Sequence, residues 1–483
     1  MPLIRPYKGE EPEFPFYRMR TPRLLWFIPI LIMIGIITVF AVLVRDEMHT
    51  SKLQAEWITY YDRLIHYDLK PGPNQAMRYP DDGPYNHRLG YSYLPFFVKS
   101  LAADNYIVAA QARTSAMYDY FVDRGLYPIY HAKTATGLAL YDRDGRPVYS
   151  ASYPAHLFTD FDSIPPVLVN TLLYIENRDL MKPGAPTHNP VVEWRRFFYA
   201  SFGHLMQKFV PRLNTGGGST LATQIEKFRY SPNGETHNAK DKLLQIASAS
   251  LRVYLDGPDT EKAGKQLVLD YLNSTTLGAR PGFGEINSIG DGLWAWFGID
   301  LNAANIALNL PDDPDSLRVK AHVYRAALGL ILAQRRPTYY FSTGHSALDD
   351  LTDTTLDRLA SAGVITPTLR DATKAASFRF LAEPPPLPQP PYIEQKATNA
   401  MRTHLLTMLG LTKFYELDRL DLAARTTLDE PTQHNMVDFL KKMGNRDFLQ
   451  VNGLYGFRLL DPENDPTKIK WSVVIYEKRH RRK

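Results

Sequence analysis

Glycines, hydroxyl groups and a lysine gather in one short stretch, residues 214–230. Three consecutive glycines precede Ser219 and Thr220, and Gln224 and Lys227 follow one and two turns later along one helix face. Glycine lets the backbone adopt positive φ angles and approach a ligand closely. A helix capped by a hydroxyl residue presents N–H groups that favour an anion, so the stretch suits a pyrophosphate. A flexible glycine hinge before an ordinary capped helix explains the same residues, and the ending of a nucleotide P-loop is missing.

Glu176 is a further candidate for a catalytic role. It follows an apolar helical stripe that starts near Ser163, where a capping residue and two prolines favour a helix N-terminus. A carboxylate at the end of an apolar face is partly desolvated, which suits it to accept a proton. An ordinary C-terminal glutamate paired with Arg178 fits the same spacing.

The composition excludes several classes of site. The chain has no cysteine, which excludes disulfides, thiolate metal sites and cysteine nucleophiles. Its net charge is +5 over 483 residues, with scattered positive residues, so nucleic acid is not expected as a partner. His188 and His204 have no partner at metal-ligand spacing, and we predict no metal site built on them.

Residues 24–44 form an uncharged apolar run. At 1.5 Å per residue these 21 residues span a hydrocarbon core of roughly 30 Å. The run is longer than the apolar region of a signal peptide, and no small-residue cleavage site follows it. Basic residues before the run outnumber those just after it, which places the N-terminus in the cytoplasm. We predict a cytoplasmic tail at 1–23 and one transmembrane helix at 24–44; a buried core helix is the alternative.

The remaining pattern is mainly helical. Two apolar runs around an Asp-Gly turn predict a β-hairpin over residues 137–149. Residues 302–314 are expected to form a polar excursion, and the prolines of 384–391 a stiff linker. Residues 191–212 carry aromatic and basic side chains at helical spacing, a pattern that fits either a membrane interface or a core-facing helix. Helices are further expected over residues 53–69, 107–121, 238–254, 261–272, 324–333 and 366–376.

The order of four segments resembles glycosyltransferase family 51, the peptidoglycan polymerases found alone or as the N-terminal half of class A penicillin-binding proteins. The resemblance covers roughly residues 135–380. It implies a mainly α, lysozyme-like domain, here joined to an N-terminal transmembrane helix and small α+β accessory regions. The family's membrane-facing subdomain corresponds to about residues 181–214. The segments are Ile175-Glu-Asn-Arg-Asp, Gly217-Gly-Ser-Thr-Leu-Ala-Thr-Gln-Ile-Glu-Lys227, Tyr271-Leu-Asn with Gly278, and Leu328-Gly-Leu-Ile-Leu-Ala-Gln-Arg-Arg-Pro337.

The resemblance also implies a reaction and its residues. The family's substrate is lipid II, a disaccharide-peptide joined by pyrophosphate to a polyprenyl chain. A carboxylate takes the proton from the 4-hydroxyl of the acceptor sugar, which attacks the anomeric carbon of the lipid-linked strand with inversion, and polyprenyl pyrophosphate leaves. Glu176 matches the family's catalytic base. The positions that match or lie near its pyrophosphate-binding residues are Ser219, Thr220, Gln224, Lys227, Lys240 and Lys242.

Two departures from the family pattern affect the expected chemistry. Asn177 follows Glu176 where the family usually has aspartate, and Leu244 or Gln245 stands where its third motif usually has a second glutamate. A neutral Gln245 can hydrogen-bond a sugar or orient a lysine, but it does not hold a cation by charge. We assign Gln245 to substrate binding and assign no cofactor, with a divalent cation, Mg²⁺ or Mn²⁺, as the open alternative.

The chain is thus divided into several regions. A segment at 422–433 is similar to the one that joins the two halves of class A penicillin-binding proteins, but no Ser-x-x-Lys with a partnering Lys-Thr-Gly follows, which excludes acyl transfer. The expected regions are a tail at 1–23, a span at 24–44, an extracytoplasmic region at 45–135, the glycosyltransferase-like domain at 136–380, a Pro-rich linker at 381–392 and a linker-like region at 393–483.

The sequence therefore predicts a peptidoglycan glycosyltransferase held by one span in the bacterial inner membrane, with the bulk of the chain outside the cytoplasm. Its expected partners are lipid II, the growing glycan strand and the membrane, with other cell-wall synthesis proteins left open. One alternative is a catalytically impaired scaffold that binds lipid II during cell-wall assembly. The other is a lysozyme-like enzyme that cleaves glycan strands, with Glu176 as general acid.

Overall fold

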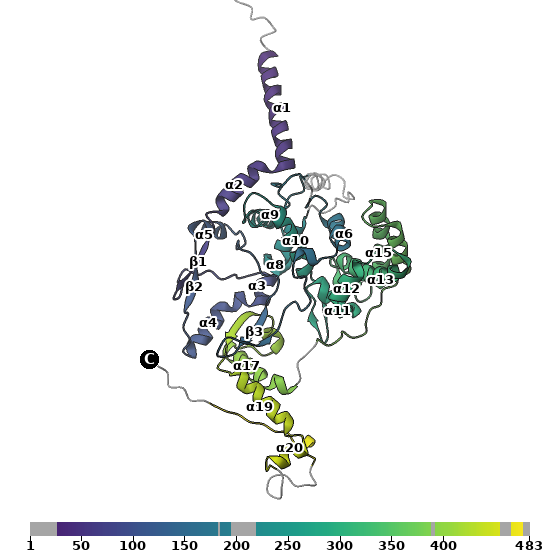
Figure 1. Ribbon diagram of the computed structural model, residues 1–483. Helices are drawn as coiled ribbons and strands as arrows, with labels where there is room; N and C mark the ends of the chain where they lie inside the picture. Colours follow the sequence, from purple (N-terminus) through teal and green to yellow (C-terminus); the bar gives the residue numbers. More distant parts are fainter. Residues whose placement is uncertain (1–26, 182–183, 195–218, 388–391, 455–464, 477–483) are drawn as a thin grey trace, which may run out of the picture.

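The computed structural model describes residues 27–181, 184–194, 219–387, 392–454 and 465–476, and they are mainly helical, as predicted (Figure 1). A long helix, α1 (Phe27–Thr50), projects from one end of the molecule. Its stretch Pro29–Thr50 has a mean hydropathy of 2.1 and no buried part, so its length and composition fit a membrane span or a signal sequence. The helix continues past the predicted end at Val44 to Thr50, since the mostly polar residues 45–50 are also helical.

The region after α1 combines short helices with a two-stranded sheet. Leu69, which the sequence placed in a helix, lies in strand β1 opposite Ala112 of β2, so the predicted helices 53–69 and 107–121 are each wrong in part. The backbone N–H and C=O groups of β1 pair with those of β2, although the two strands are about forty residues apart along the chain. The elements are α2 (Lys52–Asp62), β1 (Tyr67–Pro71), α3 (Pro84–Leu89), α4 (Leu94–Ala103), β2 (Ala110–Thr114) and α5 (Ala116–Asp123).

The predicted hairpin is confirmed, and it belongs to a larger sheet. Strands β3 (Gly137–Tyr141) and β4 (Pro147–Ser150) pair antiparallel. Strand β7 (Asp421–Arg425), from the distant C-terminal region, pairs parallel with β3 and gives the order β4-β3-β7. Parallel pairing needs a long connection, and here the whole helical domain provides it. The C-terminal region therefore completes a sheet that begins near residue 137.

The helical domain is built around α13 (Pro314–Ala333), which is buried along most of its length. This helix starts ten residues before the predicted 324–333, because Asp313 caps it by accepting from the N–H groups of Asp315 and Ser316. The expected excursion at 302–314 is wrong in part, since residues 302–308 belong to helix α12 (Leu301–Leu308) and only 309–313 form a non-helical connection. The other helices are α6 (Pro166–Glu176), α8 (Leu221–Tyr230), α9 (Ala239–Val253), α10 (Glu261–Ser274), α11 (Ile289–Phe297), α12 (Leu301–Leu308), α14 (Pro337–Tyr340), α15 (His345–Ser361) and α16 (Pro367–Ala375).

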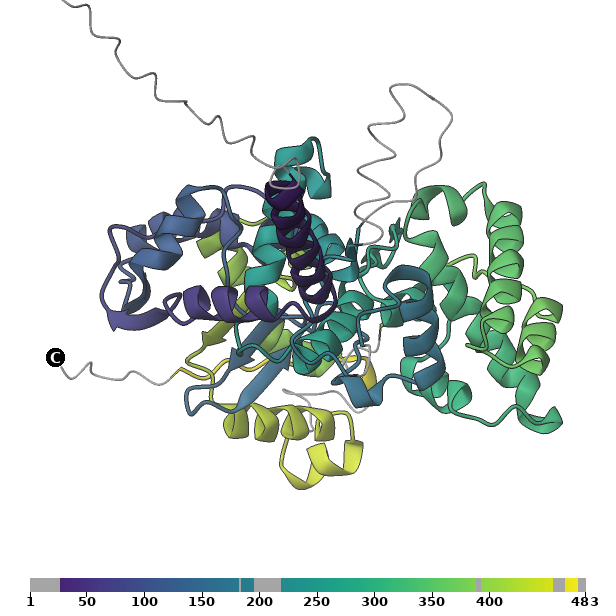
Figure 2. The same ribbon diagram turned by 90° about the horizontal axis from the view of Figure 1, so that it is seen from above.

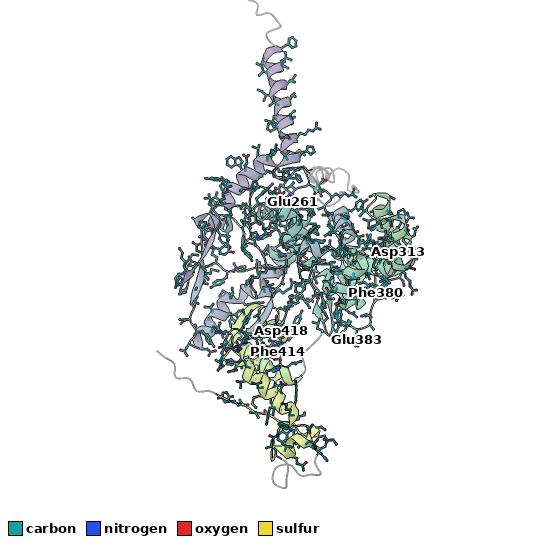
Figure 3. All side chains as sticks on the ribbon, in the orientation of Figure 1. Glu261, Asp313, Phe380, Glu383, Phe414 and Asp418 are labelled. Atoms are coloured by element: carbon teal, nitrogen blue, oxygen red, sulfur yellow. The ribbon has the colours of Figure 1, made fainter. Side chains whose placement is uncertain are left out.

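The C-terminal helices pack around the three-stranded sheet. Arg402 of α17 lies over the rings of Phe414 and Tyr149, at 4.0 and 4.7 Å, and its Nε donates to Asp418 at 3.1 Å. Figure 3 labels Phe414 and Asp418 at this place, below the helical domain. These elements are α17 (Tyr392–Leu409), α18 (Phe414–Leu417), α19 (Glu430–Lys442) and α20 (Arg446–Val451), and a small hairpin joins β5 (Ala279–Arg280) to β6 (Gly284–Glu285). Seen from above, α2 with the β1–β2 sheet and the α13–α15 group lie on opposite sides of α1 (Figure 2).

Candidate active site

Helix α6 places Glu176 at the edge of the core. The helix begins at Pro166, with Pro165 as its N-cap; Ser163 instead closes a preceding 3-10 turn through a capping box with Asp160. The predicted cap is therefore wrong, although the prolines lie in the first turn as expected. The apolar stripe of α6 packs into the main hydrophobic core, and Glu176, its last residue, is only 3 % exposed.

Glu176 receives hydrogen bonds from two other elements. Gln224 Nε2 of α8 donates to its Oε2 at 2.8 Å, while Gln334 Nε2 and Arg335 Nη2 donate to its Oε1, each at 3.3 Å. These donors stabilise the charge of a carboxylate that has lost most of its hydration. The Arg335 side chain is 69 % exposed, so solvent screens its part of the interaction.

Arg178, the alternative partner that the spacing offered, makes other contacts. Its Nε donates to the carbonyl oxygen of Tyr174 at 3.1 Å, and its guanidinium lies 4.0 Å from the centre of the Tyr174 ring. The contacts of the Glu176 carboxylate with α8 and with the end of α13 thus reach across the domain rather than along its own helix.

Tyr271 orients the amide of Gln224. Its hydroxyl donates to Gln224 Oε1 at 3.5 Å, the upper limit for a hydrogen bond, which leaves Nε2 directed at Glu176. Burial raises the pKa of Tyr271, and the nearby charge of Glu176 raises that pKa further, so the phenol keeps its proton and remains a donor. Each of the four segments that carry the family resemblance therefore supplies a residue to this cluster.

Thr220 has a structural role at the N-terminus of α8. It is the N-cap: its side-chain oxygen accepts from Thr223 N at 3.4 Å, and its own N–H donates to Thr223 Oγ1 at 3.0 Å. Its hydroxyl also donates to the carbonyl oxygen of Val191 at 2.8 Å, and the side chain is fully buried. The hydroxyl and the N–H of Thr220 are therefore both engaged within the protein, and its role is to cap α8. The three glycines before it lie outside the described residues.

Lys242 contacts Ser219, and Lys227 is close enough to Lys242 to affect its charge. Lys242 Nζ of α9 donates to Ser219 Oγ at 3.1 Å. Burial lowers the pKa of Lys242 to about 8, and the positive charge of Lys227 contributes to that shift. Burial also lowers the pKa of Lys227, against an opposing effect of Glu235. An anion with two charges, such as a pyrophosphate, would stabilise two partly desolvated ammonium groups that repel each other.

Lys240 and Gln245, also in α9, have different surroundings from Lys242. Lys240 is exposed in the first turn of α9. Gln245 is fully buried, and its Nε2 donates to the hydroxyls of Ser231, at 3.0 Å, and Thr236, at 2.8 Å. The Gln245 amide therefore links α9 to the segment that follows α8. Its position as a substrate-binding residue remains a prediction.

The divalent cation left open by the sequence has poor support from the residues present. The third-motif position carries Leu244 or Gln245, neither of which has a charge to hold a cation, and Asn177 stands where the family usually has aspartate. Among the residues that the structure describes, no three His, Asp or Glu side chains lie close enough together to hold a metal ion. We therefore assign no step to a cation.

Two of the contacts to Glu176 came from residues to which the sequence gave no role. Gln334 and Arg335 stand at the end of α13, where an apolar helix changes abruptly to a polar run. That change fits an ordinary helix C-terminus equally well, and the fourth segment of the family resemblance contains both residues without assigning them a role. The aromatic pattern at 191–212 lies outside the described residues from residue 195 onward.

Comparison with known families identifies the class of the helical domain. A family model described as Transglycosylase matches residues 144–350. The chain thus carries a transglycosylase domain of the glycosyltransferase 51 class, and the resemblance drawn from its motifs is confirmed. Such a domain implies the polymerisation of peptidoglycan glycan strands. A search of curated proteins gave no match.

Proposed function

We propose that this protein is a membrane-anchored peptidoglycan glycosyltransferase that polymerises lipid II and releases polyprenyl pyrophosphate. One observation carries the proposal: helix α8 joins the two parts of the site. Its Gln224 contacts Glu176 at 2.8 Å, and its N-terminal side carries Ser219, which contacts Lys242 at 3.1 Å. The proton acceptor on α6 and a lysine on α9 are thereby both in contact with α8 or the residue before its cap.

The reaction needs a base on one side of the reacting carbon and positive charge on the other. Glu176 takes the proton of the acceptor 4-hydroxyl as its oxygen forms a bond to the anomeric carbon of the donor strand. The bond from that carbon to the pyrophosphate oxygen breaks with inversion, and both of its electrons go to the pyrophosphate. Lys227, Lys242 and the N-terminus of α8 stabilise the charge that develops there.

The apolar helix α1 provides the anchor in this proposal. Its length and hydropathy suit a bilayer, and the basic residues before it favour a cytoplasmic N-terminus. The helical domain would then lie on the outer side of the inner membrane. A substrate attached to a polyprenyl chain must be met at that surface, so an anchored domain and a lipid-linked sugar fit each other.

A second candidate function is supported by Gln245. Leu244 or Gln245 stands where the family usually has a second acid, and neither is charged; the Nε2 of Gln245 is already engaged by Ser231 and Thr236. A groove lacking that charge could bind lipid II as an assembly scaffold without turning it over. We place this function second because Glu176 and the lysine pair keep the other groups that the reaction needs.

Polymerisation of labelled lipid II by the purified full-length chain tests the proposal. We expect polymer from the wild type and a loss of at least about 100-fold in Glu176→Gln, since a positioned base contributes roughly 10²–10⁴-fold. Glu176→Gln should still bind lipid II, because its amide leaves the lysine pair intact. The matched control is Arg178→Gln, a change two residues away on the exposed side, which should retain activity.

Each other outcome favours a different reading. Binding by the wild type without any polymer would support the scaffold. Shortening of preformed glycan strands would support the lysozyme-like cleavage that the sequence left open. Equal activity of Glu176→Gln and the wild type would remove Glu176 from the reaction.

A further inference from the structure

Helix α2 carries an apolar stripe that faces solvent. The stripe consists of Leu53, Trp57, Tyr60 and Leu64, which are 58, 63, 60 and 39 % exposed. Leu53, Trp57 and Tyr60 lie four and three residues apart, which puts them on one face of α2, and Leu64 follows in the turn after the helix ends at Asp62. The opposite face, with Ala55, Thr59 and Asp62, is buried toward the body of the protein, where α2 packs on α9. The stripe therefore contributes nothing to the hydrophobic cores of the described chain.

A rigid corner fixes the direction of α2 relative to α1. Ser51 turns the chain with a φ of 52° and is fully buried. The Glu47 carboxylate of α1 accepts from the backbone N–H groups of Leu53 and Gln54, both at 2.9 Å, and so caps α2. An acid at this position also interacts favourably with the helix dipole. Side chains and backbone together hold the two helices in one arrangement.

The same corner is joined to the candidate active site. Thr187 Oγ1 donates to the carbonyl oxygen of Thr50 at 2.6 Å, and Asn189 Nδ2 donates to Gln54 Oε1 at 3.1 Å. Asn189 Oδ1 accepts from the N–H of Val191, whose carbonyl oxygen accepts from Thr220, the N-cap of α8. The corner between α1 and α2 is thus connected by hydrogen bonds to the helix that contacts Glu176.

We propose that the α2 stripe rests on the outer leaflet of the membrane, at the level of the lipid headgroups. The inference relies on the anchoring of α1 given under the proposed function. Helix α2 starts at the foot of α1, on the end of the molecule from which α1 projects, and it lies open beside α1 when seen from that end (Figures 1 and 2). The first stripe residue, Leu53, follows the end of α1 at Thr50 by three residues, so the stripe begins beside the proposed anchor.

The side chains themselves suit this layer. Tryptophan and tyrosine prefer the boundary between hydrocarbon and water, because their rings are apolar and each carries one polar group. Exposed Lys52 and Arg63 flank the stripe at its two ends and would meet lipid phosphates. A second copy of the chain fits the stripe less well, since a stable protein interface takes about 20–30 residues per side. Four side chains along about 16 Å of helix are far fewer.

The contact has a consequence for the reaction site. A span alone fixes one point of the protein at the membrane and leaves it free to tilt. A second contact along α2 would hold the domain at one tilt, and the hydrogen bonds of the corner would transmit that tilt to α8 and Glu176. The α2 stripe would therefore set the height and orientation of the site above the bilayer.

The absence of cysteine from the chain allows a direct test. Single cysteines are introduced into the full-length protein, spin-labelled and reconstituted in nanodiscs that contain anionic lipid. Collision of the label with oxygen, which concentrates in hydrocarbon, is compared with collision with a water-soluble nickel chelate. Matched neighbours give the contrast: Leu53→Cys against Lys52→Cys, Trp57→Cys against Glu56→Cys, and Leu64→Cys against Arg63→Cys.

We expect the stripe member of each pair to have a severalfold higher ratio of oxygen to nickel collisions, with the ratio greatest at Leu53 and Trp57. Equal, water-like ratios within all pairs would overturn the proposal. Immobilised stripe labels without oxygen access, at high but not at low protein density, would assign the stripe to a second copy and overturn it as well. Phe40→Cys on α1 separates failure of the anchor from failure of the stripe, because without a span its label would also be water-exposed.

Discussion

At the scale of single residues, the charge of Lys242 in the candidate site changes with pH in an accessible range. Its pKa is lowered to about 8, from 10.5, by burial and by the charge of Lys227. Below pH 8 the ammonium carries its charge and attracts an anion; above pH 8 the amine becomes neutral. We therefore expect the affinity for lipid II to fall as the pH rises through about 8.

Binding of lipid II to the Glu176→Gln variant over a pH series measures this effect without turnover. Lys242→Arg is the control, since arginine stays charged and should flatten the profile. Lys227→Ala should weaken binding at every pH and move the profile to higher pH, because it removes the neighbouring positive charge. A wild-type profile that stays flat through pH 8 would remove Lys242 from anion binding.

Single residues also show how much of the candidate site could be predicted from the sequence. The motifs identified Glu176 and Gln224, which lie in contact, and Lys227 and Lys242, whose charges act on each other. They gave no role to Arg335, because its contact with Glu176 joins positions 159 residues apart. The structural use of the Thr220 hydroxyl was equally hidden, since its acceptor at Val191 belongs to another segment.

At the scale of elements, a buried ion pair holds α8 against α9. Arg252 Nε donates to the buried carboxylate of Glu226 at 2.7 Å, and Arg252 Nη2 donates to the carbonyl oxygen of Pro128 at 2.9 Å. Glu226 lies between Gln224 and Lys227 in sequence, on a different face of the same helix. The pair therefore fixes how α8 presents the two site residues.

We expect Glu226→Leu to lower the free energy of unfolding by about 3–5 kcal/mol, because it leaves the Arg252 charge buried without its carboxylate. Urea denaturation of the purified protein measures the loss. The double variant Glu226→Leu with Arg252→Met removes both charges and should lose less. If the single variant is as stable as the wild type, or less affected than the double variant, the pair does not hold α8 in place.

Element prediction succeeded where the signal was local. The helix expected at 366–376 is observed as Pro367–Ala375, with Thr366 as its cap, and the hairpin around the Asp-Gly turn is present. Prediction of elements failed where the sequence signal was ambiguous or depended on two distant segments together. The β1–β2 pairing cannot be seen in either strand alone, and Asp313, which caps α13, resembles a loop residue when only its neighbours are considered.

At the scale of the whole molecule, the C-terminal region is built into the same core as the hairpin. Leu138 and Leu140 of β3 are fully buried in a cluster with Leu409, Leu417 and Leu420, which come from the opposite end of the chain. The sequence predicted a linker-like region at 393–483. Strand β7 and these leucines look like part of an exposed amphipathic segment in the sequence, because their packing partner β3 lies far away along the chain.

This arrangement leads to a prediction about truncation. A chain that ends at residue 387 keeps the transglycosylase match but loses three buried leucines and the strand that pairs with β3. Burial of a leucine stabilises a protein by about 1.5–3 kcal/mol, so the loss is on the order of 5 kcal/mol. That is comparable to the whole stability of many domains. We expect the truncated protein to melt at a markedly lower temperature and to bind a hydrophobic dye.

A single substitution tests the same idea within the intact chain. Leu417 is fully buried, whereas Val451 in α20 is 85 % exposed. Leu417→Ala should cost about 2–5 kcal/mol, and Val451→Ala should change stability little. Because β4 continues directly into the segment that leads to α6, loosening the sheet should also lower lipid II turnover. A truncated chain with wild-type melting and wild-type turnover would instead make the C-terminal region an appendage to a domain that folds and works alone.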